Sequence, residues 1–262
     1  MFYILLSLCL LLQPLLQGAS LLIPGSLTHE TVVSPKQKVE GSIPIQNEGD
    51  SPLKIQVTLA DYLFNSKGES FFPSAGTCPR SNTSWIQTNK MQFEVAPHAT
   101  YSFAYTLQVP DDPSLEGSYW SIFLIEPVEE NSVSPEQKQS LGVQTVIRYG
   151  VQVLTHLGKT GSYDLKITDK KIVQEKELKT FAISVDNIGT HSLSPALTLE
   201  LIQTTGKKMG RFETVKQRIL PSCSTTYQVD LSSVPQGKYK AMLILDHGEN
   251  ALFGAQYDFS LD

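Results

Sequence analysis

The sequence contains little cysteine, and its cysteines lie far apart. Three occur in 262 residues, at positions 9, 78 and 223. Cys9 belongs to the N-terminal segment, which leaves Cys78 and Cys223, one in each half of the chain. Export to an oxidising compartment would allow Cys78 and Cys223 to pair as a disulfide, provided that their Cα atoms came within about 7 Å. The sequence leaves this disulfide and two separate thiols both open.

An excess of basic charge and long apolar runs are also absent. The net charge is −5 with 18% charged residues, which gives no electrostatic footprint for nucleic acid. The apolar run from Ile4 to Leu12 is too short to cross a bilayer, which needs about 20 residues. Small residues follow it at Gly18 to Ser20, so residues 1–20 are predicted to be a cleaved secretory signal peptide. We expect an exported protein without a membrane span.

Catalytic and metal-binding motifs are missing as well. The five histidines, at positions 29, 98, 156, 191 and 247, stand singly, whereas zinc sites usually place two ligands a few residues apart. No Gly-x-Ser-x-Gly motif occurs. Gly158-Lys-Thr160 is similar to the end of a phosphate-binding loop, but Val153 stands where that motif requires glycine. We therefore expect no enzyme activity, no metal and no cofactor.

What the sequence does contain is one strand pattern that occurs twice. Val109-Pro110 followed by Gly117-Ser-Tyr119 is matched by Val234-Pro235 followed by Gly237-Lys-Tyr239. Upstream, the turn Asn47-Glu-Gly49 is matched by Asn187-Ile-Gly189. Asn and Gly tolerate left-handed backbone angles, so each pair is expected to close a strand. A period well above the roughly 20–50 residues of solenoid repeats indicates a duplicated domain.

The predicted fold is all-β, with two tandem immunoglobulin-like β-sandwich domains. Turns about every ten residues separate short alternating runs, which is typical of such sandwiches. Residues 21–157 are predicted to form the first domain, 158–161 a glycine-rich linker and 162–262 the second domain. The expected strands are 21–23, 39–46, 53–63, 91–95, 101–109, 119–126 and 143–154, then 163–167, 180–186, 196–202, 212–219, 225–231, 239–245 and 256–261.

Three local features refine this prediction. Pro44 cannot donate a ladder hydrogen bond, so its strand is expected to lie at a sheet edge there. The long polar connection from 65 to 88 contains the sequon Asn82-Thr-Ser84, which matters only if the source glycosylates. Trp85 lies in the same connection and is expected to be available for contact with a sugar or another partner.

Residues 43–59, 95–110 and 141–153 resemble the PapD-like periplasmic chaperones of pilus assembly, which have two immunoglobulin-like domains. The matching features are the turn from Asn47 to Pro52, the Trp85-Ile86 pair before a strand that reaches Pro97, and a polar loop before the last strand of the first domain. The family's Tyr-Arg-Pro strand end is replaced by Val-Leu-Thr-His156, and its Phe-Trp-Leu-Asn run by the run that starts at Gly117. This second run also resembles cell-wall-associated surface proteins.

The resemblance implies a chaperone that lends its last first-domain strand to a pilin-like subunit, while basic residues hold the subunit's terminal carboxylate. Odd positions from Leu141 to Val153 are apolar or β-branched, as strand addition requires. The residues implied in partner binding are Leu141, Val143, Thr145 and Ile147 for the strand, and Arg148 with Lys36 or Lys38 for the carboxylate. The chain would then be periplasmic. The alternative is an extracellular or cell-surface adhesion module that binds glycan or protein.

Overall fold

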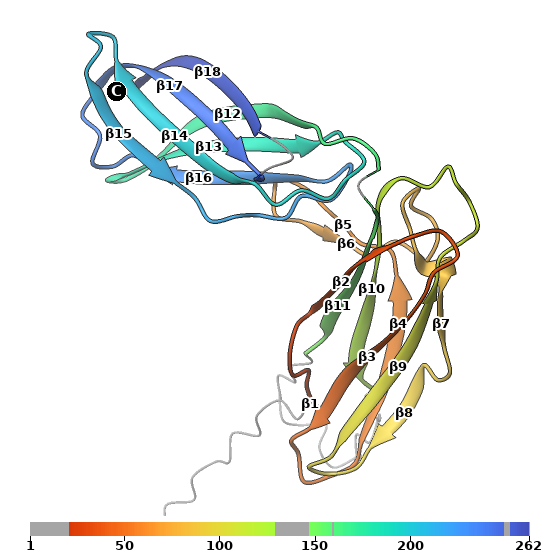
Figure 1. Ribbon diagram of the computed structural model, residues 1–262. Coiled ribbons are helices and arrows are strands. Elements are labelled where there is room, and N and C mark those ends of the chain that lie inside the picture. Colours follow the sequence, from red (N-terminus) through yellow and green to blue (C-terminus); the bar gives the residue numbers. More distant parts are fainter. Residues whose placement is uncertain (1–20, 129–146, 159, 249–251, 262) are drawn as a thin grey trace, which may run out of the picture.

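The computed structural model describes residues 21–128, 147–158, 160–248 and 252–261, and these residues form two β-sandwiches (Figure 1). The first contains β1 (Leu21–Leu22), β2 (Thr28–Val33), β3 (Lys38–Asn47), β4 (Leu53–Ala60), β5 (Leu63–Phe64), β6 (Ser70–Phe71), the 3-10 helix η1 (Thr83–Trp85), β7 (Ile86–Thr88), β8 (Gln92–Val95), β9 (Thr100–Gln108), β10 (Gly117–Pro127) and β11 (Tyr149–Leu157). The second contains β12 (Leu165–Glu175), β13 (Leu178–Asn187), β14 (Ala196–Gln203), β15 (Lys208–Glu213), β16 (Ser224–Asp230), β17 (Gly237–Asp246) and β18 (Leu252–Leu261). The predicted all-β fold of two sandwiches is confirmed.

Each sandwich consists of two sheets. In the first, the order β1-β3-β9-β7 faces the order β2-β11-β10-β4-β8, and β5 and β6 form a separate hairpin. In the second, β12-β13-β16 faces β15-β14-β17-β18. All the pairings are antiparallel except that of β2 with β11, which is parallel. The parallel pairing matters for the candidate site, because β2 covers only part of the edge of β11.

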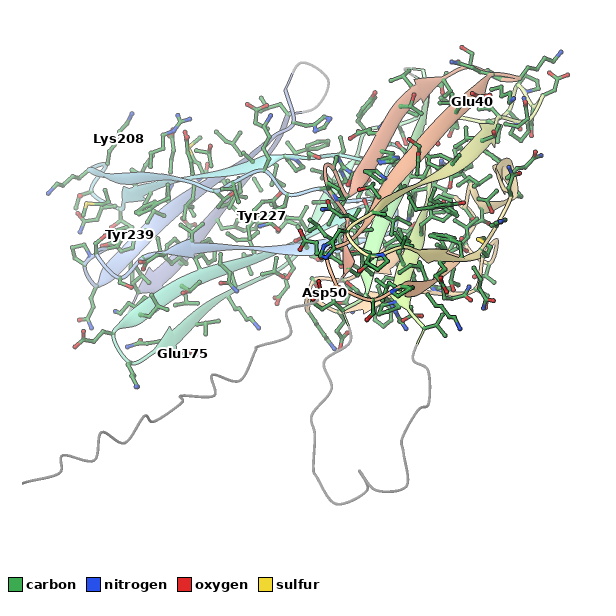
Figure 2. All side chains as sticks on the ribbon, turned by 90° about the horizontal axis from the view of Figure 1, so that it is seen from below. Glu40, Asp50, Glu175, Lys208, Tyr227 and Tyr239 are labelled. Atoms are coloured by element: carbon green, nitrogen blue, oxygen red, sulfur yellow. The ribbon has the colours of Figure 1, made fainter. Side chains whose placement is uncertain are left out.

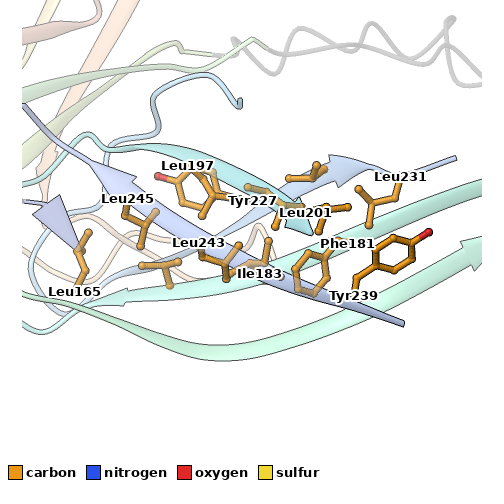
Figure 3. Packing of buried hydrophobic residues seen from close by; sticks show 14 of the residues in the cluster. Leu165, Phe181, Ile183, Leu197, Leu201, Tyr227, Leu231, Tyr239, Leu243 and Leu245 are labelled. Atoms are coloured by element: carbon orange, nitrogen blue, oxygen red, sulfur yellow. The ribbon is translucent and has the colours of Figure 1, made fainter. Parts of the chain in front are cut away.

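Alternating apolar side chains fill the space between the sheets. In the first sandwich, Phe103 of β9 meets Phe123 of β10 edge to face at 5.3 Å between ring centroids, and both rings are almost fully buried. In the second, Ile183 of β13 and Leu243 of β17 approach from opposite sheets (Figure 3). Tyr227 and Tyr239 lie inside this sandwich, as Figure 2 shows, and their hydroxyls donate to the carbonyls of Pro195 and Pro235.

The duplicated Asn-x-Gly turns are equivalent in space. The buried amide of Asn47 donates to the carbonyls of Val95 and Ala96, and the buried amide of Asn187 donates to those of His191 and Ile219. In both turns the amide oxygen accepts the N–H of the glycine two residues on. Neither turn uses a positive φ. The expectation of a left-handed backbone conformation at these turns is therefore wrong. The asparagine side chains instead form hydrogen bonds with buried backbone groups.

Several strand boundaries differ from the sequence prediction. β2 was not expected, and β11 runs over 149–157 where 143–154 was predicted, with residues 143–146 outside the described part. β15 covers 208–213 in place of 212–219, because the chain leaves the sheet after Glu213 and Val215 is 79% exposed. Pro44 does lie where β3 lacks a second partner, since β1 pairs only with Gln46 and Asn47.

Two residues of the long polar connection are buried, contrary to expectation. Trp85 is only 6% exposed and packs against Tyr119 with 4.8 Å between ring centroids. Asn82 is fully buried, and its amide donates to the carbonyl of Val153 and to Oγ1 of Thr155. The prediction that Trp85 is accessible for contact with a sugar or another partner is therefore wrong. Asn82 of the sequon is likewise inaccessible in the folded chain.

Candidate functional site: a strand edge and an interdomain cleft

The last strand of the first sandwich has an edge that is open only at its beginning. β10 pairs with β11 from Tyr149 to Leu157 on one side. On the other side β2 pairs in parallel from Gln152 onward, and the N–H of Gln152 donates to the carbonyl of Leu27. Among the described residues, Tyr149 to Val151 therefore have one strand partner each. An exposed strand edge of this kind can accept an added strand.

The predicted strand-contact residues precede this open edge. Ile147 lies two residues before β11 and is 38% exposed. Leu141, Val143 and Thr145 lie outside the described residues. Val151 and Val153 are almost fully buried in the core of the sandwich, so the apolar alternation of the sequence has a core role in this part of β11.

The basic residues assigned to the carboxylate are not brought together. Both Nε and Nη2 of Arg148 lie 2.6 Å from Oε2 of Glu126, at the start of β11. Lys36 lies beyond the other end of β11, in the turn after β2, and its Nζ is 2.9 Å from a carboxylate oxygen of Asp111. The nine residues of β11 separate the two positions by roughly 30 Å at about 3.3 Å per residue.

A cleft between the two sandwiches begins where the open edge ends. It is a shallow depression, open to solvent, of about 510 Å³. The first sandwich contributes Thr28, Tyr62, Phe64 and Gln152, and the second contributes Ser194, Lys216 and Arg218. Lys216 is exposed and makes no ion pair within the described part of the chain. The cleft thus has an aromatic wall opposite two cations.

A chain of hydrogen bonds crosses the junction beside this cleft. The N–H of Ser192 donates to Oγ of Ser118, and that Oγ lies 2.8 Å from Nδ1 of His156. Nε2 of His156 is 2.8 Å from Oε1 of Glu30, whose Oε2 accepts from Arg218 at 2.7 Å. Because a carboxylate only accepts, Nε2 of His156 is assigned the proton and Nδ1 accepts the Ser118 hydroxyl. We call this set the junction relay.

The junction relay has the residue types of a hydrolase triad but not its accessibility. Ser118 is fully buried, and its oxygen already accepts the Ser192 N–H. A catalytic serine must reach the reacting carbonyl of its substrate. The relay therefore joins the two sandwiches and offers no nucleophile to solvent.

One buried and one half-buried histidine lie near the relay. His191 stacks on Tyr163 at 4.4 Å between ring centroids and on His156 at 5.8 Å. Burial lowers the pKa of His191 below its ordinary value. Burial likewise lowers the pKa of His247, whose Nδ1 accepts the N–H of Ser194 in the wall of the cleft. The neutral imidazoles are thus favoured at the junction.

An apolar cluster and a hairpin complete the junction. Trp120 and Leu154 of the first sandwich pack with Leu220 and Cys223 of the second. The β5–β6 hairpin reaches across at its tip, where the N–H of Ser66 donates to Oγ of Ser224 (Figure 1). Oγ1 of Thr226 donates back to the Ser66 carbonyl. The cleft is therefore bounded by contacts that fix both of its walls.

The described residues contain neither a metal-binding cluster nor a membrane-spanning helix. Within the described ranges, no group of three or more His, Cys, Asp or Glu residues is arranged to hold a metal ion. No helix in these ranges is long and apolar enough to cross a membrane. The cations of the cleft were missed from the sequence, because Lys216 and Arg218 alternate with Val215 and Ile219 as the solvent face of a strand would.

Comparison with known proteins gives matches among solved structures only. No family model and no curated protein matches the chain. A chain from a chaperone–tip adhesin complex of CFA/I fimbriae biogenesis has a TM-score of 0.49 at 11% identity, covering 91% of this chain and 98% of that one. The class 5 fimbriae chaperone CfaA has a TM-score of 0.46 at 11% identity, with the same coverage. A chain of the CsuC–CsuE chaperone–tip adhesion subunit complex of Acinetobacter baumannii has a TM-score of 0.45 at 11% identity, covering 90% and 98%. At these identities the similarity concerns the arrangement of strands alone.

Proposed function

We propose that this chain is an exported, periplasmic chaperone-like protein that binds a β-rich, pilin-type subunit by adding a strand to it. The observation that carries this proposal is the open edge of β11, which ends at the cleft at Gln152. A subunit strand that pairs along Tyr149 to Val151 would run directly into the cleft. Ile147, and Leu141, Val143 and Thr145 before it in the sequence, would supply alternating side chains to the subunit's groove.

The subunit's terminal carboxylate is assigned to the cleft cations in place of Arg148 and Lys36. Arg148 is paired with Glu126 and Lys36 with Asp111, at opposite ends of β11. Arg218 is held by Glu30 in the junction relay, so its position is fixed. Lys216, whose ammonium has no acidic partner among the described residues, would then bind the carboxylate. A hydrogen bond to a charged group contributes about 1.5–3 kcal/mol.

The strand edge is tested with the Ile147→Glu and Val143→Glu variants. A bound side chain of this size is worth about 1.5–3 kcal/mol when it becomes fully buried, so each variant should lose capture of a subunit from periplasmic extract. The thermal melt should stay nearly unchanged, because Ile147 contributes little to the core. Leu178→Glu is the matched control, since Leu178 is also exposed but lies at the start of β13 in the second sandwich, outside the lining of the cleft.

Mass spectrometry of the captured protein decides the proposal. A partner with an incomplete immunoglobulin-like sandwich, lost with Ile147→Glu and kept with Leu178→Glu, would support strand addition. Equal capture by all variants would refute it. A melt lowered strongly by Val143→Glu would show that Val143 belongs to the core.

The carboxylate is tested with a synthetic peptide that has the sequence of the captured subunit's last strand. Lys216→Gln should weaken binding of the peptide with a free C-terminus by about 10- to 100-fold, as expected for about 1.5–3 kcal/mol. The same peptide with an amidated C-terminus should bind the original chain and the variant equally. An equal loss for both peptides would assign Lys216 a role other than carboxylate binding.

A further inference from the structure

One cysteine from each sandwich lies near the junction between them. Cys78 lies in the connection between β6 and η1 of the first sandwich, and Cys223 lies just before β16 of the second. Both are free thiols in this structure. Cys223 is almost fully buried, whereas Cys78 is half-buried. Neither takes part in the proposed subunit site.

A short series of contacts leads from Cys78 to the residues that pack around Cys223. The carboxylate of Asp61 accepts the N–H of Cys78 at 2.6 Å. The next residue, Tyr62, accepts the indole N–H of Trp120 through its carbonyl at 2.6 Å. Tyr62 and Trp120 then pack in the apolar cluster that contains Cys223. Cys78 is therefore held by Asp61, and the next residue in the chain, Tyr62, packs against the cluster that contains Cys223.

The pKa values of the two thiols also indicate that the cysteines are near each other. Burial raises the pKa of Cys223 to about 11, and the nearby Cys78 contributes to this rise. Burial and the charge of Asp61 raise the pKa of Cys78. A charge on one sulfur is thus felt by the other across the junction. Both groups are protonated at neutral pH, which makes attack by either one slow.

We propose that Cys78 and Cys223 form a disulfide that links the two sandwiches across their junction. The oxidant is a disulfide-bearing molecule, either a protein thiol oxidase or oxidised glutathione. The Cys78 thiolate attacks one sulfur of that disulfide and releases the first oxidant thiol. The Cys223 thiolate then attacks the Cys78 sulfur and releases the second. Two protein thiols and one disulfide become one protein disulfide and two thiols, so atoms and electrons balance.

The bond would act on the geometry of the cleft. Tyr62 and Phe64 line the cleft and also pack in the cluster with Cys223. Linking Cys78 to Cys223 would therefore hold the aromatic wall of the first sandwich against the second. Cys78 is the thiol that reacts first with the oxidant, because it is the less buried of the two.

The test is peptide mapping of the whole chain after oxidation. Protein incubated with oxidised glutathione is alkylated under denaturing conditions and digested with trypsin without reduction. Cys78 then lies in the peptide 68–80 and Cys223 in the peptide 219–238. We expect these two peptides to appear linked to each other, and to separate on reduction. Because both thiols have raised pKa values, the rate should increase by about tenfold for each pH unit above neutrality.

A Cys223→Ser variant is the matched control, because it keeps Cys78 and removes its partner. Its 68–80 peptide should carry glutathione or join a second copy of itself, and the same products in the original chain would overturn the proposal. Recovery of both peptides in alkylated form from oxidised protein would overturn it as well. The linked peptides in a monomeric protein are the supporting result.

Discussion

Glu30 holds the two sandwiches together with both of its oxygens. It accepts from His156 of its own sandwich and from Arg218 of the other. An ion pair that is as exposed as Glu30 and Arg218 contributes little by itself, typically below about 1 kcal/mol. The contribution comes from the whole relay, because Ser118 and Ser192 continue it into a fully buried region. Glu30 therefore positions a buried network more than it supplies Coulomb energy.

Protonation of the junction histidines should weaken the fold in mild acid. Burial lowers the pKa of His191, and the neighbouring His156, Arg80 and His247 lower it further, against an opposing hydrogen bond from the ring to the backbone of Thr160. Its folded pKa thus lies below the ordinary 6.5, so the unfolded chain binds more protons between the two values. Stability then rises with pH through this window, is fully present above 6.5 and is lost as the pH falls.

This prediction is checked by denaturant unfolding between about pH 8 and pH 5. The original chain should lose stability as the pH falls below the ordinary histidine value, and His191→Gln should show a shallower slope. Asp61 provides a separate window. Burial alone would raise the pKa of its carboxyl, but hydrogen bonds from Ser81, Cys78 and Gly76 hold it below 3.8. Its contribution is lost only in stronger acid, so an unchanged slope in His191→Gln would contradict the histidine assignment.

At the scale of elements, alternation predicted most of the strands because one face of each strand packs on a core. The strand from Tyr239 to Leu245 is a clear case, with odd positions buried and even positions exposed. β2 was missed because its sequence, Thr28 to Val33, mixes charged and β-branched residues and buries only one side chain. Its place is set by parallel pairing with β11, which is a long-range contact. Such pairing leaves no local pattern in the sequence.

The candidate site was predicted only in part for the same physical reason. The last strand of the first sandwich was identified, since the alternation from Leu141 to Val153 is intrinsic to that segment. The unpaired edge of this strand ends at Gln152, where β2 begins to pair with it. The cleft cations depend on how the second sandwich sits against the first, which no local pattern records. The spacing of Lys216 and Arg218, two residues apart between apolar residues, was the signal available.

At the scale of the whole molecule, Gly117 and Gly161 are closely packed at the junction of the sandwiches, whereas Gly158 of the linker has open space around it. Gly117 has a positive φ, and a Cβ there would lie 2.2 Å from the Thr190 carbonyl of the second sandwich. Gly161 also has a positive φ, and a Cβ there would lie 2.3 Å from Oγ1 of Thr190. The positive φ of Gly117 agrees with the tight turn that its sequence predicts. Gly117 and Gly161 also permit close approach of the two sandwiches.

The separate fragments 21–157 and 162–262 should each give a β-type circular dichroism spectrum and a cooperative thermal melt under reducing conditions. Each contains a complete hydrophobic core of its own, with 18 buried members in either case, and independent domains are expected to fold alone.

Separation should expose Trp120, which is 4% exposed in the whole chain and packs on Leu220 and Cys223. Its fluorescence should therefore shift to the red in fragment 21–157, while Trp85 stays in the core of that fragment. The same fragment with Trp120→Phe should show no shift, and this control assigns the signal to the junction. An unfolded fragment 162–262 would refute the two-domain division, and an unshifted Trp120 would show that the junction is not what covers it.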